Sequence, residues 1–292
     1  MMKKIGIVSC DKWNGIIKED LLLQKELINR GHLAEIISWE DKNINYNEYE
    51  CLILRSVWGY QNKYSEFKKW LLFLKEHNIK IFNDVDILLN NIRKDKQFQI
   101  LDKYSISHIN TKFIKNKENL NKLISTNAKL IIKPIISGSG NNTFKLFSSE
   151  SSSIDQKEIV KAFESIFSVE DNGAMLQPYI PEIKNGEYAC IFIGGINTHN
   201  MLRYPGIFTE KQRPIYLETI PKDISKLAYQ VSSIAEFNKS LYMRVDIIYN
   251  AGMPTVMEVE LAEPDLLIKY IPDNKIQKEI MRLFAKKLER KL

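Results

Sequence analysis

The first third of the chain alternates short apolar runs with segments whose apolar positions recur every three or four residues. The apolar runs predict β-strands, and the segments with the longer period predict amphipathic helices. The order strand, helix, strand, strand, helix, strand is typical of a Rossmann-like domain with a parallel sheet. The expected strands span residues 3–10, 33–39, 51–56 and 80–83, and the expected helices span residues 19–32 and 65–78.

From about residue 86 the pattern changes to strands and helices separated by polar loops, and no internal repeat is evident. Strands are expected at residues 111–114 and 129–136, within residues 173–195, and in a long hairpin over residues 241–261. Helices are expected at residues 93–105, 117–127, 157–167 and 275–292. We therefore expect an α/β protein in three units, residues 1–85, 86–180 and 181–292.

Composition narrows the class of protein. The 292 residues are 44% hydrophobic and 27% charged, as in an ordinary globular protein. The formal charge of +6 comes from lysines scattered over expected helices, and no basic cluster with interleaved aromatic residues indicates nucleic-acid binding. No segment approaches a membrane span, and the first apolar run is too short for a signal peptide. Cys10, Cys51 and Cys190 are far apart, so we expect reduced, packed thiols in a cytoplasmic protein.

The hairpin carries three carboxylates that alternate with apolar residues. Glu258 and Glu260 share one face of their strand, and Asp246 falls on the same face if the loop contains an odd number of residues and no bulge intervenes. Two charges about 4 Å apart repel by about 4 kcal/mol at an effective dielectric constant near 20. Arg244 offsets part of this repulsion, but a hard cation such as Mg²⁺ suits three oxygen ligands better. The alternative is a half-buried strand with one face in water.

A lysine interrupts the apolar strand in "LIIKPIISGSGNNT", which spans residues 130–143. Lys133 and the backbone of the Gly-Ser stretch that follows can together hold phosphate oxygens. The stretch is not a Walker A loop, because no Gly-Lys-Ser/Thr follows. Lys96, taken alone, is typical of a solvated side chain.

A third feature is the stretch "MLQPYIPEIKNGEYACIFIGG", where an apolar strand meets Pro178 and Pro181. The interrupted strand exposes backbone groups that could hydrogen-bond a flat heterocycle between Tyr179 and Ile180. A linker between two subdomains would show the same prolines.

In their order along the chain, these features resemble the ATP-grasp superfamily. Within it the sequence is most similar to the prokaryotic glutathione synthetase-type ligases, and "LRSVWGY" and "RVDII…MEVELAEPDLL" are similar to the subgroup of the cycloserine-forming cyclo-ligase. The resemblance implies an ATP-grasp fold that follows the Rossmann-like domain, with residues 86–180 as the lid subdomain and residues 181–292 carrying a metal site.

The resemblance also implies roles for individual residues. ATP would bind to Lys96, Lys133, Ser137, Gly138, Ser139, Gly140, Gln177, Tyr179, Ile180 and Glu187. Two Mg²⁺ ions, or Mn²⁺ in their place, would bind to Asp246, Glu258 and Glu260. Lys133, Arg203 and Arg213 would be catalytic, steadying the transferred phosphate or the substrate carboxylate.

Two departures argue against glutathione itself as the product. Glu260 stands where glutathione synthetases often have Asn, and residues 203–217 lack the glycine-rich loop expected of those enzymes.

The resemblance predicts an ATP-dependent ligase. It would activate a small carboxylate as an acyl phosphate, which an amine or another nitrogen nucleophile then attacks; self-association is left open. Asp11, Arg55 and Ser56 follow strands of the first sheet, where ligands of open α/β sheets bind, and are the candidates for substrate binding. For Arg55 a structural ion pair is the alternative. The alternative function is a nucleotide-binding regulatory protein that has kept the fold without turnover.

Overall fold

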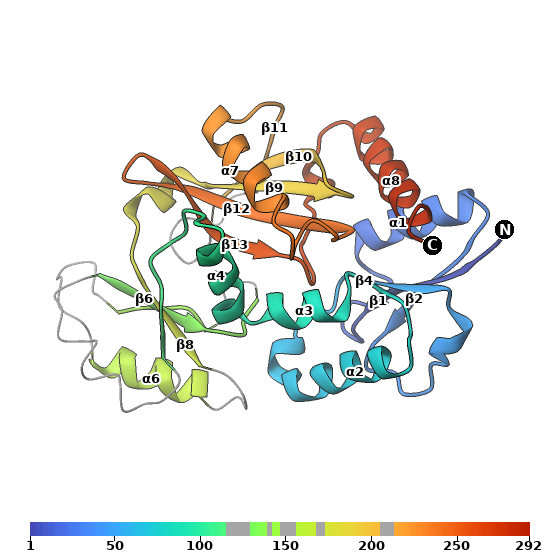
Figure 1. Cartoon of the computed structure of the whole chain (residues 1–292), viewed down its shortest axis with the longest axis horizontal. Coiled ribbons are helices and arrows are strands. Elements are labelled where there is room, and N and C mark those ends of the chain that lie inside the picture. The colour runs from blue at the N-terminus through green and yellow to red at the C-terminus, as the bar shows by residue number, and fades with distance from the viewer. Residues whose placement is uncertain (115–128, 139–141, 147–155, 168–172, 205–212) are drawn as a thin grey trace.

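The computed structural model describes residues 1–114, 129–138, 142–146, 156–167, 173–204 and 213–292. Its strands form three sheets that follow one another along the chain, and Figure 1 shows them from blue through green to orange and red. The expected boundaries after residues 85 and 180 fall between the sheets, and the division into domains stays a prediction. The expected helix at residues 117–127 lies outside the described residues.

The first sheet is parallel, as the sequence predicted, with the order β2-β1-β3-β4. Leu23 and Leu27 of its first helix pack in one core with Ile5 and Ile7 of the central strand. Short 3₁₀ turns at Tyr46–Glu48 and Tyr60–Lys63 complete the domain. The elements are β1 Lys4–Ser9, α1 Lys18–Asn29, β2 Leu33–Ser38, β3 Cys51–Leu54, α2 Tyr64–Glu76 and β4 Ile81–Phe82.

Two helices lead from the first sheet to the second, α3 (Val85–Ile92) and α4 (Lys94–Lys103), and Figure 1 shows them crossing the middle of the molecule. The second sheet is antiparallel, with the order β5-β8-β6-β7 and a helix packed against it. Its elements are β5 Lys112–Ile114, β6 Leu130–Pro134, β7 Phe144–Lys145, α6 Gln156–Phe167 and β8 Ala174–Pro178.

The third sheet has the order β11-β10-β9-β12-β13 and is covered on both faces because its central strand is apolar on both. Ile191 of β9 shares a core with Phe284 of α8, whereas Phe192 shares one with Val231 of α7. 3₁₀ turns occur at Pro181–Asn185 and Ile268–Tyr270. The elements are β9 Glu187–Ile193, β10 Ile196–Arg203, β11 Ile215–Leu217, α7 Lys222–Ser232, β12 Tyr242–Asn250, β13 Met253–Glu260 and α8 Asn274–Glu289.

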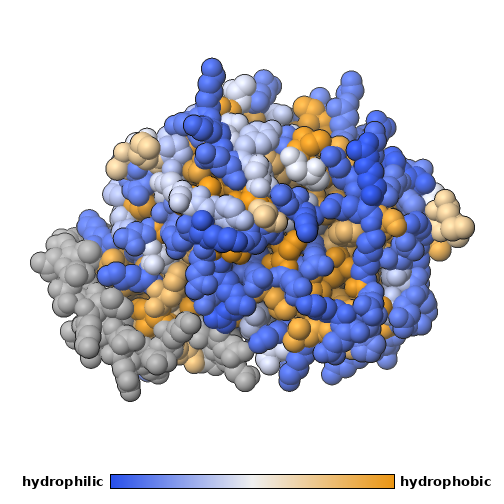
Figure 2. All heavy atoms as spheres, viewed as in Figure 1, coloured by the Kyte–Doolittle hydropathy of each residue, from blue (hydrophilic) through white to orange (hydrophobic). Residues whose placement is uncertain are grey.

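The C-terminal helix α8 lies beside α1, so the two ends of the chain meet on one side of the molecule (Figure 1). Hydrophilic residues cover most of the face shown in Figure 2, with apolar residues visible between them near the centre. Among the described residues, no helix combines the length and the apolar character needed to cross a membrane.

Candidate active site

A cavity of about 830 Å³ lies where the three parts of the chain meet. A volume of this size is typical of small-molecule and cofactor sites, which measure about 300–1,000 Å³. The described residues that were predicted to bind nucleotide or metal and that line this cavity are Lys133, Ser137, Gly138, Gln177, Tyr179, Ile180, Glu187, Asp246, Glu258 and Glu260. Arg203, predicted to be catalytic, lines it too. The sequence therefore predicted most of one continuous surface.

The β12–β13 hairpin places its carboxylates on one face by an unexpected route. Its turn contains two residues, Ala251 and Gly252, both with positive φ angles. This even-numbered loop alone would put Asp246 opposite Met257. A bulge between Asp246 and Ile247 in the register shifts the pairing, so that Asp246 lies opposite Glu258. The loop is therefore even-numbered, and the bulge, which the prediction had excepted, restores the common face.

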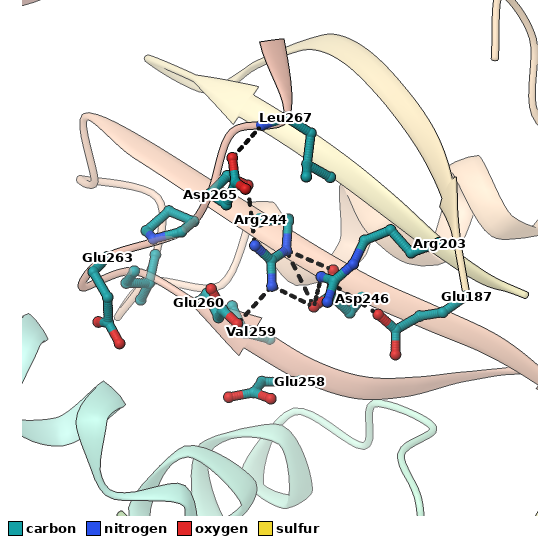
Figure 3. Close-up of polar contacts among 12 residues, drawn as sticks. Glu187, Arg203, Arg244, Asp246, Glu258, Val259, Glu260, Glu263, Asp265 and Leu267 are labelled. Carbon is teal, nitrogen blue, oxygen red and sulfur yellow. Dashed lines mark hydrogen bonds and ion pairs between the residues drawn. The ribbon is translucent and has the colours of Figure 1, made fainter. Parts of the chain in front are cut away.

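Arginines lie among these carboxylates (Figure 3). The Arg244 side chain donates to Asp246 Oδ1 at 2.8 Å and to Glu260 Oε1 at 2.5 Å. Arg203 Nη1 lies 3.1 Å from Asp246 Oδ2 and 3.5 Å from Glu187 Oε1. Opposite charges therefore offset much of the repulsion that the sequence indicated.

The described residues contain no group of three acidic, His or Cys side chains arranged to hold a metal ion. The donor set of three carboxylates on one face suits Mg²⁺ chemically, but Arg244 lies between Asp246 and Glu260. Burial, with neighbouring carboxylates adding to it, raises the pKa of Glu187 and Glu260 to about 7. A cation bound beside these two carboxylates would favour their charged forms.

On α4, the lysine that faces the carboxylates is Lys94, whereas the sequence predicted that Lys96 binds the nucleotide. Lys94 Nζ lies 2.7 Å from Glu258 Oε1 and donates to the Ser137 carbonyl at 2.9 Å. Lys96 is exposed, donates to Asn90 Oδ1 at 3.3 Å and is not part of the cavity lining. The expected position of Lys96 is therefore corrected. The helical period gives the reason, since Lys94 shares the inward face of α4 with Gln97 and Leu101.

Lys133 lies on β6 and lines the same cavity. Burial lowers its pKa, although nearby carboxylates, Glu258 foremost, oppose this shift. Burial also works against ionisation of Glu258, but attraction to Lys94 and then to Lys133 outweighs it, and the pKa of Glu258 is lowered. Two lysines on the lid side thus face carboxylates on the hairpin side.

The end of β8 forms another wall. Gln177 is buried and donates from Nε2 to Thr111 Oγ1 at 2.8 Å. The Tyr179 N–H donates to the Lys129 carbonyl at 2.8 Å, and the Ile180 carbonyl accepts from Ile183 at 3.2 Å. An adenine contact at this turn would therefore not use the Tyr179 N–H, whereas the Ile180 carbonyl has a second lone pair that can accept.

The residues predicted to bind substrate lie outside the cavity lining. Arg55 is 3% exposed and lies 3.5 Å from both Glu19 Oε2 and Asp20 Oδ1, so the structure favours the ion-pair alternative. Ser56 is buried and bonds Ser9 Oγ at 2.8 Å. Asp11 is exposed, and its N–H donates to Glu40. Burial and existing partners occupy the polar groups of Arg55 and Ser56, and a substrate role for these three residues stays a prediction.

Arg213 is exposed and is not part of the cavity lining, and its catalytic role stays a prediction. Ser139 and Gly140 lie outside the described residues.

Sequence reasoning missed the loop 263–268, which carries Glu263, Asp265 and Leu267 into the cavity wall. Side chains from distant parts of the chain bind its backbone. These bonds run from Trp58 Nε1 to Glu263 O, from Arg55 to Pro264 O, from Arg244 to Asp265 O, from His199 Nε2 to Leu266 O, and from the N–H groups of Leu266 and Ile268 to Glu19. Arg55 therefore contacts the loop that forms part of the cavity wall. No local sequence signal marks such contacts, because the partners are far apart in the chain.

Two family models match separate parts of the chain. The N-terminal domain of D-cycloserine synthetase DcsG matches residues 5–83, and the ATP-grasp domain of prokaryotic glutathione synthetase matches residues 99–213. No curated protein sequence matches the chain.

Solved structures agree on the fold. The crystal structure of D-cycloserine synthetase DcsG is similar with a TM-score of 0.81 at 17% identity, over 99% of both chains. D-alanine–D-alanine ligase from Bacillus anthracis complexed with ATP gives a TM-score of 0.66 at 16% identity, over 99% of both chains. ATP-grasp ligase PsnB complexed with a minimal precursor gives 0.65 at 13% identity, over 99% of this chain and 100% of that one.

The chain therefore has an ATP-grasp fold. Its residues 5–83 are similar to the N-terminal domain of D-cycloserine synthetase DcsG and its residues 99–213 to the ATP-grasp domain of prokaryotic glutathione synthetase, so the expected resemblance is confirmed for both parts.

Proposed function

We propose that this protein is an ATP-dependent ligase that joins a small carboxylate to an amine or another nitrogen nucleophile. The observation that carries the proposal is the presence of two lysines in one cavity with the carboxylate face of the β12–β13 hairpin: Lys94 pairs with Glu258, and Lys133 lines the same cavity. Lysines suit phosphate oxygens, and the carboxylates suit the cation that accompanies a nucleotide. The similarity to ligases of the ATP-grasp fold supports this reading.

In the proposed reaction a carboxylate oxygen of the substrate attacks the γ-phosphorus of ATP. The bond between the γ-phosphorus and the bridging oxygen breaks, and ADP leaves. The nitrogen nucleophile then attacks the acyl carbon, phosphate departs with the electron pair of the acyl C–O bond, and the nitrogen loses a proton. Both reactants of the phosphoryl transfer, the carboxylate and ATP, are anionic. Catalysis therefore consists mainly of positioning and charge neutralisation.

Each group of residues has a part in this proposal. Lys94 and Lys133 hold phosphate oxygens, and Gln177 with the turn after it borders the adenine. Arg203 and Arg244, which now bind Asp246, lie where they can turn toward a transferred phosphoryl group. Asp246, Glu258 and Glu260 would hold Mg²⁺, which supplies charge neutralisation at the phosphates. The three cysteines take no part in this proposal, because none of them lines the cavity.

The experiment is to measure ADP release from ATP with a panel of amino acids and other small carboxylates, with hydroxylamine present to trap acyl phosphates as hydroxamates. The proposal predicts ADP release that depends on one class of carboxylate and forms an equal amount of hydroxamate. Tight ATP binding with no carboxylate-dependent ADP release would favour the regulatory alternative.

A further inference from the structure

The outer edge of β13 is bonded by side chains. β13 is the last strand of its sheet, with β12 on one side only. The outward N–H and C=O groups of such an edge strand face water or invite another strand. Here the backbone of residues 107–109 bonds Val256, and two carboxamide side chains bond the strand beyond it.

Gln97 and Asn91 supply those carboxamides. Gln97 Nε2 donates to Val259 O at 2.7 Å, and Val259 N–H donates back to Gln97 Oε1 at 2.9 Å. Asn91 Nδ2 donates to Val259 O at 2.7 Å, and Leu261 N–H donates to Asn91 Oδ1 at 2.9 Å. A carboxamide has one acceptor oxygen and a donor group, as a peptide has, so the two side chains replace a neighbouring strand.

The edge so held is the one that presents the carboxylates. The backbone groups of Val259 and Leu261 bond outward to the amides. Glu258, before Val259, and Glu260, between the two, line the cavity. Because side chains and backbone groups alternate along a strand, fixing Val259 fixes the direction of both neighbouring glutamates.

The same segment also touches a carboxylate directly. Lys94 lies three residues after Asn91 and three before Gln97, and it pairs with Glu258 at 2.7 Å. Asn91 and Gln97 are 5% and 1% exposed. An apolar side chain at either position would leave buried backbone groups of β13 without partners, so the two amides hold the strand at a defined place.

We propose that Asn91 and Gln97 are positioning residues that set the place of Glu258 and Glu260 in the active site. The role of those two carboxylates rests on the proposed function. A displacement of about 1 Å at a catalytic group costs up to about a hundredfold in rate, so a small shift of this edge has a measurable effect.

The test uses Gln97→Met, which keeps the length of the side chain and removes both hydrogen bonds to Val259, together with the bond to the Asn91 carbonyl. Gln277→Met is the matched control, because Gln277 is also a buried amide and donates to Ile271 O at 2.7 Å on the far helix α8. Three quantities are measured in each variant: hydrogen exchange of the Val259 amide by NMR, kcat and KM(ATP) for ADP release, and the increase in Tm that Mg²⁺ adds to nucleotide.

For Gln97→Met we expect exchange at Val259 to accelerate at least about tenfold, because its acceptor is lost. We expect kcat to fall about tenfold to a hundredfold with KM(ATP) changed less than about threefold, and the Mg²⁺-dependent increase in Tm to shrink. Gln277→Met should lower Tm without any of these three changes. If Gln97→Met does not fold, Gln97→Asn, which keeps an amide but cannot span both groups, gives the same test.

A Gln97 variant with faster exchange at Val259 but unchanged kcat and Mg²⁺ response would overturn the proposal. So would an equal loss of kcat in Gln277→Met, which would show a general effect of stability. Failure of the proposed function looks different: the wild-type protein then releases no ADP with any carboxylate, while the exchange and Tm measurements still report whether the amides fix the strand.

Discussion

Lys94 Nζ lies 2.7 Å from Glu258 Oε1, which joins the lid side of the cavity to the carboxylate face of the hairpin. The lysine also donates to the Ser137 carbonyl at the start of the Gly-Ser stretch. A nucleotide phosphate entering here would compete with Glu258 for the ammonium group, and a cation would compete with Lys94 for the carboxylate. The pair therefore positions an ammonium group for a nucleotide phosphate and a carboxylate for its metal ion.

Lys94→Met should weaken ATP binding, whereas Lys96→Met should leave it unchanged. A hydrogen bond to a charged group contributes about 1.5–3 kcal/mol, so the Kd for ATP should rise about tenfold to a hundredfold in the first variant. Lys96 is the matched control, two residues away on the exposed face of the same helix. Isothermal titration calorimetry with both variants decides the matter, and equal effects would contradict the assignment.

Lys133→Met should weaken ATP binding and lower turnover by about a hundredfold while the fold persists, because the methionine keeps the aliphatic stem and loses the charge. Loss of a buried lysine with a lowered pKa removes a desolvation cost, so Tm should not fall much. Steady-state kinetics and a thermal melt test this, and unchanged affinity and rate would remove Lys133 from the site.

Glu258→Gln should lower turnover sharply and also destabilise the protein without metal. Repulsion among the three carboxylates would by itself make the variant more stable, but Glu258 is paired with Lys94 and its pKa is lowered. A lowered pKa means that this carboxylate stabilises the fold above its ordinary pKa of 4.5 and that this contribution is lost as the pH falls. Urea unfolding at neutral pH should give a smaller free energy of unfolding for the variant. A larger free energy of unfolding would instead show that repulsion among the carboxylates dominates.

Arg55→Ala should act mainly on stability, because it leaves Glu19 and Asp20 buried without their cation. Removing one partner of a buried ion pair costs about 3–5 kcal/mol. Arg30→Ala, which breaks a partly exposed pair with Glu289, should cost about 0–1 kcal/mol. Denaturant unfolding of both variants measures the difference, and an Arg55 variant of full stability with a raised KM for the carboxylate would support direct substrate binding instead.

His199 gives the protein a predicted pH dependence. Burial lowers its pKa from 6.5 to about 4, so between these values the unfolded state binds a proton that the folded state does not. Stability should therefore fall as the pH drops below 6.5, by about 2 kcal/mol at pH 5 from this group. His199→Gln, which can still donate to the Leu266 carbonyl, should lose less stability between pH 7 and pH 5 than the wild type. Equal losses in both proteins would contradict this.

The sequence predicted the elements that local patterns determine. The strands and helices of the first domain follow from apolar runs and the helical period, and the shared face of Glu258 and Glu260 follows from strand alternation. The resemblance indicated Lys96, whereas the buried face of α4 carries Lys94, and the nucleotide-binding role of either lysine stays a prediction.

Other features depend on contacts that no local pattern records. A two-residue turn with a bulge places Asp246 on the same face as Glu258, and so would an odd-numbered loop without a bulge. Strand alternation alone therefore could not distinguish the two arrangements. The loop 263–268 is fixed by Glu19 and His199, which lie far away in the sequence. Arg55 follows a strand of the first sheet as a ligand-binding residue would, and only its buried partners show its structural role.

The most direct test of the account is a crystal structure of the protein with Mn²⁺ and a non-hydrolysable ATP analogue, with the anomalous signal of manganese recorded. The account predicts manganese peaks beside Asp246, Glu258 and Glu260, and phosphate oxygens within hydrogen-bond distance of Lys94 and Lys133. Nucleotide bound in another place, or manganese absent from these carboxylates while nucleotide fills the cavity, would contradict it.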